Sequence, residues 1–146
     1  MALIYIDTSA VVRAYFADER DHEQLYKLLT GPDPIVTSEL TRVEFASAVS
    51  AAYRVRRTAD PSVVLDRFDL DCGQDGLVTL LRLDAQAVLP LARKLVIEQV
   101  VRTLDAIHLA VALTDATALA GGDSVVFLTR DNRQAAAAKE LGLAVI

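Results

Sequence analysis

Residues 3–9 read Leu-Ile-Tyr-Ile-Asp-Thr-Ser, an apolar run that ends in a carboxylate followed by two hydroxyl side chains. A short apolar run bounded by cap residues is typical of a buried strand in a parallel sheet. Residues 125–131, Val-Val-Phe-Leu-Thr-Arg-Asp, have the same order near the other end of the chain. The two stretches therefore predict two strands that are followed by Asp7 and Asp131.

Strands and helices are expected to alternate along the rest of the chain. Helical spacing of apolar residues, or a helix-starting residue, marks the segments 10–16, 22–29, 39–57, 62–71, 85–98, 104–119 and 132–141. Short apolar runs at 35–37, 78–81 and 143–146 predict further strands. This alternation predicts a parallel sheet with helices on both faces, an α/β/α sandwich. No segment repeats and no linker divides the chain, so we expect one domain over residues 1–146.

The composition favours a soluble protein of the cytoplasm. Of the 146 residues, 53% are hydrophobic, which is enough for the core of one domain. No apolar run reaches the roughly 20 residues of a membrane span, and residues 1–5 lack the basic start of a signal peptide. The lone Cys72 cannot form an internal disulfide. The net charge of −5 means that binding to nucleic acid would depend on local basic groups or bound cations.

Two further carboxylates lie where the pattern predicts burial. Glu44 falls in the apolar half of its helix, and Asp105 opens the helix with the most apolar composition. Carboxylates are rarely buried unless they are paired or bind metal. Each acid alone also has a plainer interpretation. Asp7 suits a helix N-cap, and Asp105 complements a helix dipole. Glu44 suits an ion pair with Arg42 or Arg54.

Together the four acids indicate a metal site. Ligands of open parallel sheets bind at the carboxyl ends of the strands, where Asp7 and Asp131 converge if their strands are neighbours. Four carboxylates in one cleft repel one another unless their pKa values rise or cations bind. Mg²⁺ takes one or two carboxylates, keeps several waters and binds substrate phosphate. Two histidines and one cysteine provide no competing transition-metal motif. The pattern therefore favours metal-assisted phosphoryl chemistry.

Four short motifs follow one another along the chain: Ile6-Asp7-Thr8-Ser9-Ala10, Val43-Glu44, Leu104-Asp105-Ala106-Ile107-His108-Leu109-Ala110 and Leu128-Thr129-Arg130-Asp131. In this order they resemble the PIN-domain ribonucleases, and most of all the VapC toxins of bacterial toxin–antitoxin pairs. The resemblance spans essentially the whole chain. It implies a PIN-type α/β/α fold, Mg²⁺ or Mn²⁺ dependence, and endoribonuclease activity on structured RNA, with tRNA and rRNA both open. It also implies a homodimer and inhibition by a small antitoxin protein.

The resemblance, together with the chemistry of the side chains, suggests a role for each site residue. Three acids are expected to hold the metal, directly or through water: Asp7, Asp105 and Asp131. Glu44 would bind through water or orient the attacking water. The hydroxyls expected to fix these carboxylates belong to Thr8, Ser9 and Thr129. Asp123, in the loop with Gly121 and Gly122, is the alternative to Asp131 as the fourth acid.

Other polar residues are less specific. His108 lies one turn after Asp105 and is interpreted as a satisfied helix histidine rather than a general base; His22 is expected to be exposed. The densest basic group combines Tyr53 with the arginines 54, 56 and 57, a pattern typical of a solvated surface. Four further arginines lie beside the acidic motifs and are candidates for contact with phosphate or antitoxin: Arg13, Arg102, Arg130 and Arg133.

Two alternatives keep the PIN fold: a non-catalytic RNA- or protein-binding module, and a housekeeping PIN nuclease without an antitoxin. Two others replace it. A carboxylate-dependent phosphatase usually has Asp-x-Asp after its first strand, and Asp7-Thr8-Ser9 does not fit. A phosphoacceptor receiver domain needs a lone Asp on its third strand and a late Lys, and the sequence lacks that arrangement.

Overall fold

A computed structural model describes all 146 residues. Its five-stranded parallel sheet has the order β3-β2-β1-β4-β5. The strands are β1 (Leu3–Ile6), β2 (Ile35–Ser38), β3 (Val78–Leu81), β4 (Val125–Leu128) and β5 (Ala144–Val145). The pairing of Leu3 with Val125 and of Ile6 with Leu128 makes β1 and β4 direct neighbours. The carboxyl ends of these two strands therefore lie side by side, as the convergence of Asp7 and Asp131 requires.

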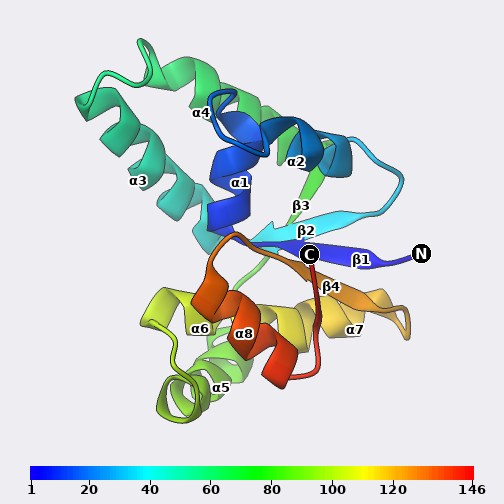
Figure 1. Ribbon diagram of the computed structural model, residues 1–146. Helices are drawn as coiled ribbons and strands as arrows, with labels where there is room; N and C mark the ends of the chain where they lie inside the picture. The colour runs from blue at the N-terminus through cyan, green and yellow to red at the C-terminus, as the bar shows by residue number, and fades with distance from the viewer.

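Helices cover both faces of the sheet, which confirms the predicted α/β/α sandwich (Figure 1). One face carries α1 (Thr8–Tyr15), α2 (His22–Leu29), α3 (Leu40–Arg54) and α4 (Pro61–Asp71). The other carries α5 (Ala85–Glu98), α6 (Thr103–Val111), the π-helical turn η1 (Ala112–Ala116), α7 (Thr117–Ala120) and α8 (Asn132–Glu140). Alternate residues of β1 point to opposite faces. Ile4 and Ile6 join the core under the first group, whereas Leu3 and Tyr5 join the core under the second.

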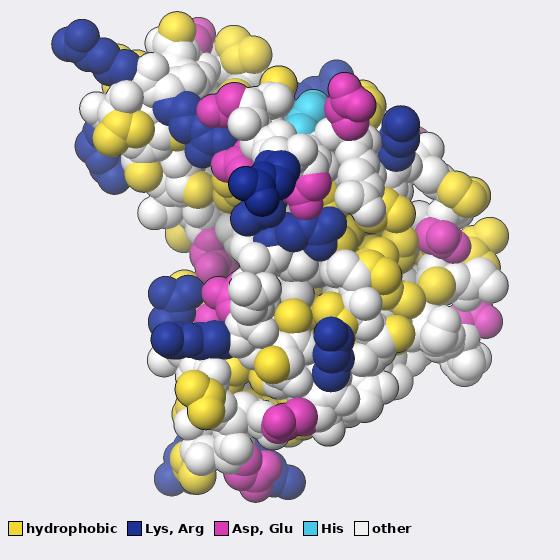
Figure 2. Space-filling view, viewed as in Figure 1, with side chains coloured by type: hydrophobic (Ala, Val, Ile, Leu, Met, Phe, Trp, Pro, Cys, Tyr) yellow, Lys and Arg dark blue, Asp and Glu magenta, His cyan; other side chains and the backbone are white.

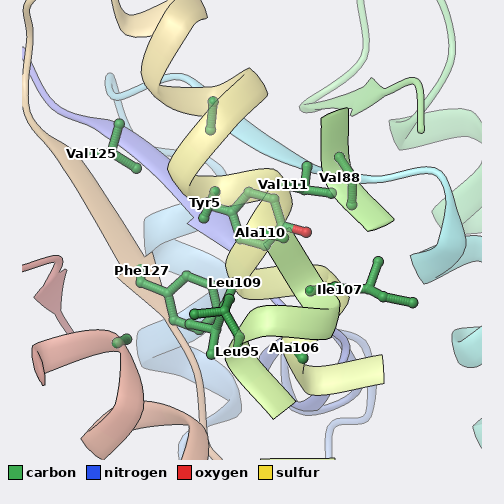
Figure 3. Packing of buried hydrophobic residues seen from close by; sticks show 14 of the residues in the cluster. Tyr5, Val88, Leu95, Ala106, Ile107, Leu109, Ala110, Val111, Val125 and Phe127 are labelled. Atoms are coloured by element: carbon green, nitrogen blue, oxygen red, sulfur yellow. The ribbon is translucent and has the colours of Figure 1, made fainter. Parts of the chain in front are cut away.

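The second core is built around an aromatic pair. The rings of Tyr5 and Phe127 stack at a centroid distance of 5.4 Å. Figure 3 shows both rings among the aliphatic side chains of α6, including Leu109. Tyr5, Phe127 and Leu109 are completely buried. This packing fixes the position of α6, which carries Asp105 and His108, against the strand that ends at Asp7.

Two predicted helix boundaries were wrong. The helix expected over residues 104–119 is interrupted by η1. Thr117 Oγ1 donates to the Ala112 carbonyl at 2.9 Å, so a side chain satisfies a backbone acceptor where the helix widens. The cap of α1 is Asp7, not the adjacent hydroxyl residues. Thr103–Ala120 is long and apolar enough by composition to cross a membrane. The stretch Ala106–Ala112 is fully buried inside the protein, however, as expected of a core helix.

Helix α3 ends in a left-handed residue that is not glycine. Arg56 has φ +59°; its N–H donates to the Tyr53 carbonyl at 2.9 Å and the Arg57 N–H donates to the Ala52 carbonyl at 2.8 Å. This is the Schellman arrangement, in which glycine is favoured at the left-handed position. We expect Arg56→Gly to raise the free energy of unfolding by about 0.5–1 kcal/mol in urea denaturation. Arg54→Gly, inside the helix, should lower it by a similar amount; equal losses in both variants would contradict this account.

Candidate active site

Asp7 is a buried carboxylate with no cationic side chain to pair with. It follows β1, and only 3% of the residue is exposed. Its Oδ1 accepts hydrogen bonds from Ser9 Oγ at 2.7 Å and from the Ala10 N–H at 3.1 Å. Its Oδ2 accepts one from Thr129 Oγ1 at 3.0 Å. Burial raises the pKa of Asp7, although the bonds from Ser9 and Ala10 act in the opposite direction. The hydroxyls thus orient the carboxylate, and its charge remains without a partner.

Glu44 is held on one oxygen only. Its Oε1 accepts from Thr8 Oγ1 at 3.0 Å and from His108 Nε2 at 2.5 Å. Partial burial opposes ionisation of Glu44, but the contacts with His108 and Thr8 outweigh it and lower its pKa. Neither Arg42 nor Arg54 pairs with Glu44, because Arg42 binds Asp69 at 2.8 Å. The ion pair suggested as the plain interpretation of Glu44 is therefore wrong.

His108 connects Glu44 to the core. It is 1% exposed, and its Nδ1 lies 2.8 Å from the hydroxyl of Tyr5. If Nε2–H donates to the Glu44 carboxylate, Nδ1 is free to accept the Tyr5 hydroxyl proton, so one neutral tautomer satisfies both contacts. His108 is thus the satisfied helix histidine that its position predicts. Its contact with Glu44, 64 residues away in sequence, had no sequence signal.

Arg102 links the other two acids. Its Nε lies 3.4 Å from Asp105 Oδ2, and its Nη2 lies 3.8 Å from Asp131 Oδ2. Asp131 also caps α8, because its Oδ1 accepts from the Gln134 N–H at 2.9 Å. The Arg102 side chain is 77% exposed, so solvent screens both contacts and they hold the acids weakly.

Arg102 is thereby distinguished from the other three arginines near the motifs. Arg13 and Arg130 both pair with Asp21, away from the four acids. Arg133 is exposed and forms no ion pair. Only Arg102 contacts members of the acidic set. The sequence placed all four arginines near the motifs but gave no means of choosing among them.

The register of the sheet separates Asp131 from Asp123. Asp123 precedes β4 and Asp131 follows it, while Asp7 follows the parallel neighbour β1. Asp123 therefore lies near the edge of the sheet where β1 begins, and the carbonyl of the adjacent Ser124 accepts from the Leu3 N–H at 2.9 Å. Strands rise about 3.3 Å per residue, so the length of β4 separates Asp123 from the edge at which Asp7 lies. Of the two candidates, only Asp131 is on the side of the other acids.

The four acids line one region in two linked parts. Glu44 and Asp105 line a hollow of about 410 Å³ together with Arg102, Thr103 and Leu104. Asp7 and Asp131 are joined through Thr129, whose Oγ1 bonds to the Asp7 carboxylate and accepts from the Asp131 N–H at 3.1 Å. Figure 2 shows acidic side chains at the base of a notch and basic side chains beside it. The largest hollow, about 860 Å³ between α3, α4 and β3, contains none of the four acids.

The chemistry of this region fits a hard divalent cation held partly through water. No three His, Cys, Asp or Glu side chains are close enough together to hold one ion directly. Mg²⁺ needs only one or two carboxylates and keeps several waters, so a closer cluster is not required. The donors are carboxylate oxygens, and the buried Asp7 has no other cation to offset its charge. A metal ion bound here would supply that charge.

Comparisons with known proteins give the same overall picture. The family model described as PIN domain matches residues 4–140. Two Mycobacterium tuberculosis proteins are similar over nearly their whole length: ribonuclease VapC35, 34% identical over 99% of this chain and 96% of the relative, and ribonuclease VapC46, 36% identical over 100% and 98%.

Solved structures share the fold at lower identity. VapC20 of Mycobacterium tuberculosis, described as a sarcin–ricin loop cleaving toxin, has a TM-score of 0.66 and 19% identity, covering 92% of this chain and 94% of its own. VapBC2 of Rickettsia felis, bound to a promoter DNA fragment, has a TM-score of 0.64 and 13% identity, with 99% and 97% covered. The length of these matches, and the sheet that brings four separate acidic motifs to one region, show that the chain belongs to the PIN-domain family as a VapC-type member.

Proposed function

We propose that this chain is a metal-dependent endoribonuclease and the toxin of a toxin–antitoxin pair. The observation that carries the proposal is the buried Asp7, held by hydroxyls without a cationic partner, in the same region as three other acids. Membership of the PIN-domain family, and relatives named as ribonucleases, support RNA as the substrate.

The metal would be Mg²⁺, with Mn²⁺ able to replace it. The residues that would hold it, directly or through water, are Asp7, Asp105, Asp131 and Glu44. When bound, the ion supplies positive charge that acidifies a water and stabilises charge on the phosphate. Ser9 and Thr129 keep both oxygens of Asp7 oriented. Thr8 and His108 occupy Oε1 of Glu44, so Oε2 is the oxygen available to orient the attacking water.

Arg102 would act on the substrate rather than on the metal. Its guanidinium is mostly exposed and lies at the rim of the hollow that Asp105 and Glu44 line. Arginine donors match phosphate oxygens well. A phosphate that enters the hollow would therefore draw Arg102 away from Asp105 and Asp131, leaving these acids free for the cation.

The biological setting is also a proposal. We infer a small antitoxin protein as inhibitor, a homodimer as the assembly, and the cytoplasm as the compartment. The structural neighbours VapBC2 and FitAcB, the latter from Neisseria gonorrhoeae, support the antitoxin. Sequence-specific RNA recognition usually targets unpaired loops, so a loop of tRNA or rRNA is the expected target.

Metal removal tests the proposed chemistry. Purified protein and an end-labelled stem–loop RNA should give discrete cleavage products with Mg²⁺ or Mn²⁺, and none above background in EDTA. The double variant Arg93→Ala/Lys94→Ala, on the exposed side of α5, should cleave like the wild type and serves as a surface control. Cleavage that persists in EDTA would overturn the metal mechanism. Binding without cleavage under every metal condition would favour the non-catalytic module.

A further inference from the structure

The outer end of α3 carries an aromatic and basic surface that the proposed catalytic chemistry does not use. Tyr53, Arg54 and Arg56, together with Thr58 and Ala59, line a hollow of about 480 Å³. We call Tyr53, Arg54 and Arg56 the α3-tip patch. All three are exposed, Tyr53 by 51%. In Figure 1 this end of α3 projects away from the sheet, and Figure 2 shows basic side chains gathered in the same part of the molecule.

The patch has a positive charge that the protein does not neutralise. The neighbouring Arg57 is fully engaged: it binds Asp18 and Glu19 at 2.7 Å, and its guanidinium lies 4.5 Å from the centre of the Phe16 ring. Arg54 and Arg56 form no ion pair and no side-chain hydrogen bond within the chain. In a protein of net charge −5, two free guanidiniums beside an exposed ring form a local site of positive potential.

Folding stability does not account for the residue at position 56. Arg56 occupies the left-handed position of the α3 cap, where glycine is the more stable choice. Its side chain forms no hydrogen bond or ion pair inside the protein that would offset this. The arginine is thus placed at a backbone cost, with its guanidinium bonded to no partner within the chain.

The patch and the acids lie on one connected surface of α3. Glu44 and Arg54 are ten residues apart, which is about 15 Å along the helix axis. Ser47 and Ala51, at i+3 and i+7 from Glu44, continue the same side of the helix; both are small and exposed. No bulky side chain of α3 therefore interrupts this stretch, and a few nucleotides of single-stranded RNA are long enough to span it.

We propose that the α3-tip patch binds an unpaired segment of the RNA substrate, a few nucleotides away from the phosphate that is cleaved. A base stacks on the ring of Tyr53, and the adjoining phosphates contact Arg54 and Arg56. Aromatic rings with arginines beside them bind single strands through stacking and charge, with little dependence on base identity. The inference rests on the proposed function, and assigns to the patch the substrate binding that the net charge of the chain opposes.

Binding in EDTA tests the patch separately from catalysis. The anisotropy of a fluorescein-labelled stem–loop RNA gives the dissociation constant at several salt concentrations. Relative to the wild type, Arg54→Ala/Arg56→Ala should weaken binding at least about fivefold and reduce the salt slope by about 0.7 for each phosphate that is no longer neutralised. Tyr53→Ala should weaken it by a similar factor, and Tyr53→Phe should not, because the ring is kept. Arg93→Ala/Lys94→Ala removes the same charge elsewhere and should leave binding within about twofold of the wild type.

Arg56→Gly distinguishes binding from structure, because it should weaken RNA binding while leaving the protein at least as stable. An RNA affinity unchanged in Arg54→Ala/Arg56→Ala, with cleavage by the wild type intact, would overturn the patch alone. Wild-type protein that binds no RNA would remove both this inference and the proposed function. If the substitutions weaken binding of a co-expressed antitoxin but leave RNA affinity unchanged, the patch is a protein-binding surface and the assignment to RNA is wrong.

Discussion

Asp7→Asn should lower RNA cleavage at least about a hundredfold and, without metal, make the protein more stable than the wild type at neutral pH. Outer contacts of a metal site are worth 10- to 100-fold in activity, so loss of the carboxylate charge itself should cost no less. Asparagine keeps an oxygen for the bonds from Ser9 and the Ala10 N–H. It removes the buried charge, so a group central to activity is unfavourable for folding of the metal-free protein.

The stability difference depends on pH with a defined sign. Burial raises the pKa of Asp7 above its value in the unfolded chain. The protonated form therefore stabilises the fold below the unfolded pKa, and this contribution is lost as pH rises through the folded pKa. Asp7→Asn and the wild type should differ least in acid, and most above the raised pKa of Asp7.

Thermal unfolding from mildly acidic to neutral pH, in EDTA and in Mg²⁺, measures this difference. Mg²⁺ should stabilise the wild type and have little effect on Asp7→Asn, because a ligand stabilises the state that binds it. Asp123→Asn is the matched control: the chemical change is the same, but the residue is exposed and near the opposite edge of the sheet. Full cleavage by Asp7→Asn, or equal loss in Asp123→Asn, would contradict the assignment of Asp7.

His108→Ala should lower the free energy of unfolding by about 3 kcal/mol or more and reduce cleavage as well. Removing a large buried side chain leaves a cavity. It also deprives the Tyr5 hydroxyl of its partner at 2.8 Å, and Glu44 of its partner at 2.5 Å. Glu44 would then retain only Thr8 on Oε1 and lose its fixed orientation.

Two milder changes separate stability from positioning. Tyr5→Phe removes only the hydroxyl bonded to His108 Nδ1 and should cost about 1–2 kcal/mol, with a smaller loss of cleavage. His22→Ala changes the other histidine, which contacts only a backbone carbonyl at 3.2 Å and a neighbouring ring, and should leave cleavage unchanged. Chemical denaturation gives the stabilities, and calorimetric titration gives Mg²⁺ affinity. Mg²⁺ affinity in folded His108→Ala equal to that of the wild type would show that His108 does not position Glu44 for the metal.

The pattern of residues was sufficient to predict the class of fold. The apolar runs of β1 and β4 and the helical spacing between them are local properties, because strands and helices repeat at fixed periods along the chain. The acids were also recognisable, since Asp7 and Asp131 follow strands and Glu44 and Asp105 break apolar patterns. Two boundaries failed for local reasons: the cap of α1 is the carboxylate itself, and threonine hydroxyls accompany the π-helical turn η1.

The sequence by itself determined the kind of fold and the identity of the acids, because periodicity and residue type can be read without knowing which segments meet. Only the tertiary structure decided the contacts between distant segments. It joined Glu44 to His108, set Arg102 between Asp105 and Asp131, and removed Asp123 to the far edge. It also showed that Arg57 is paired while Arg54 and Arg56 are free. Hydrogen bonds and ion pairs act over a few ångströms of space, so their partners are chosen by strand order and helix packing rather than by position along the chain.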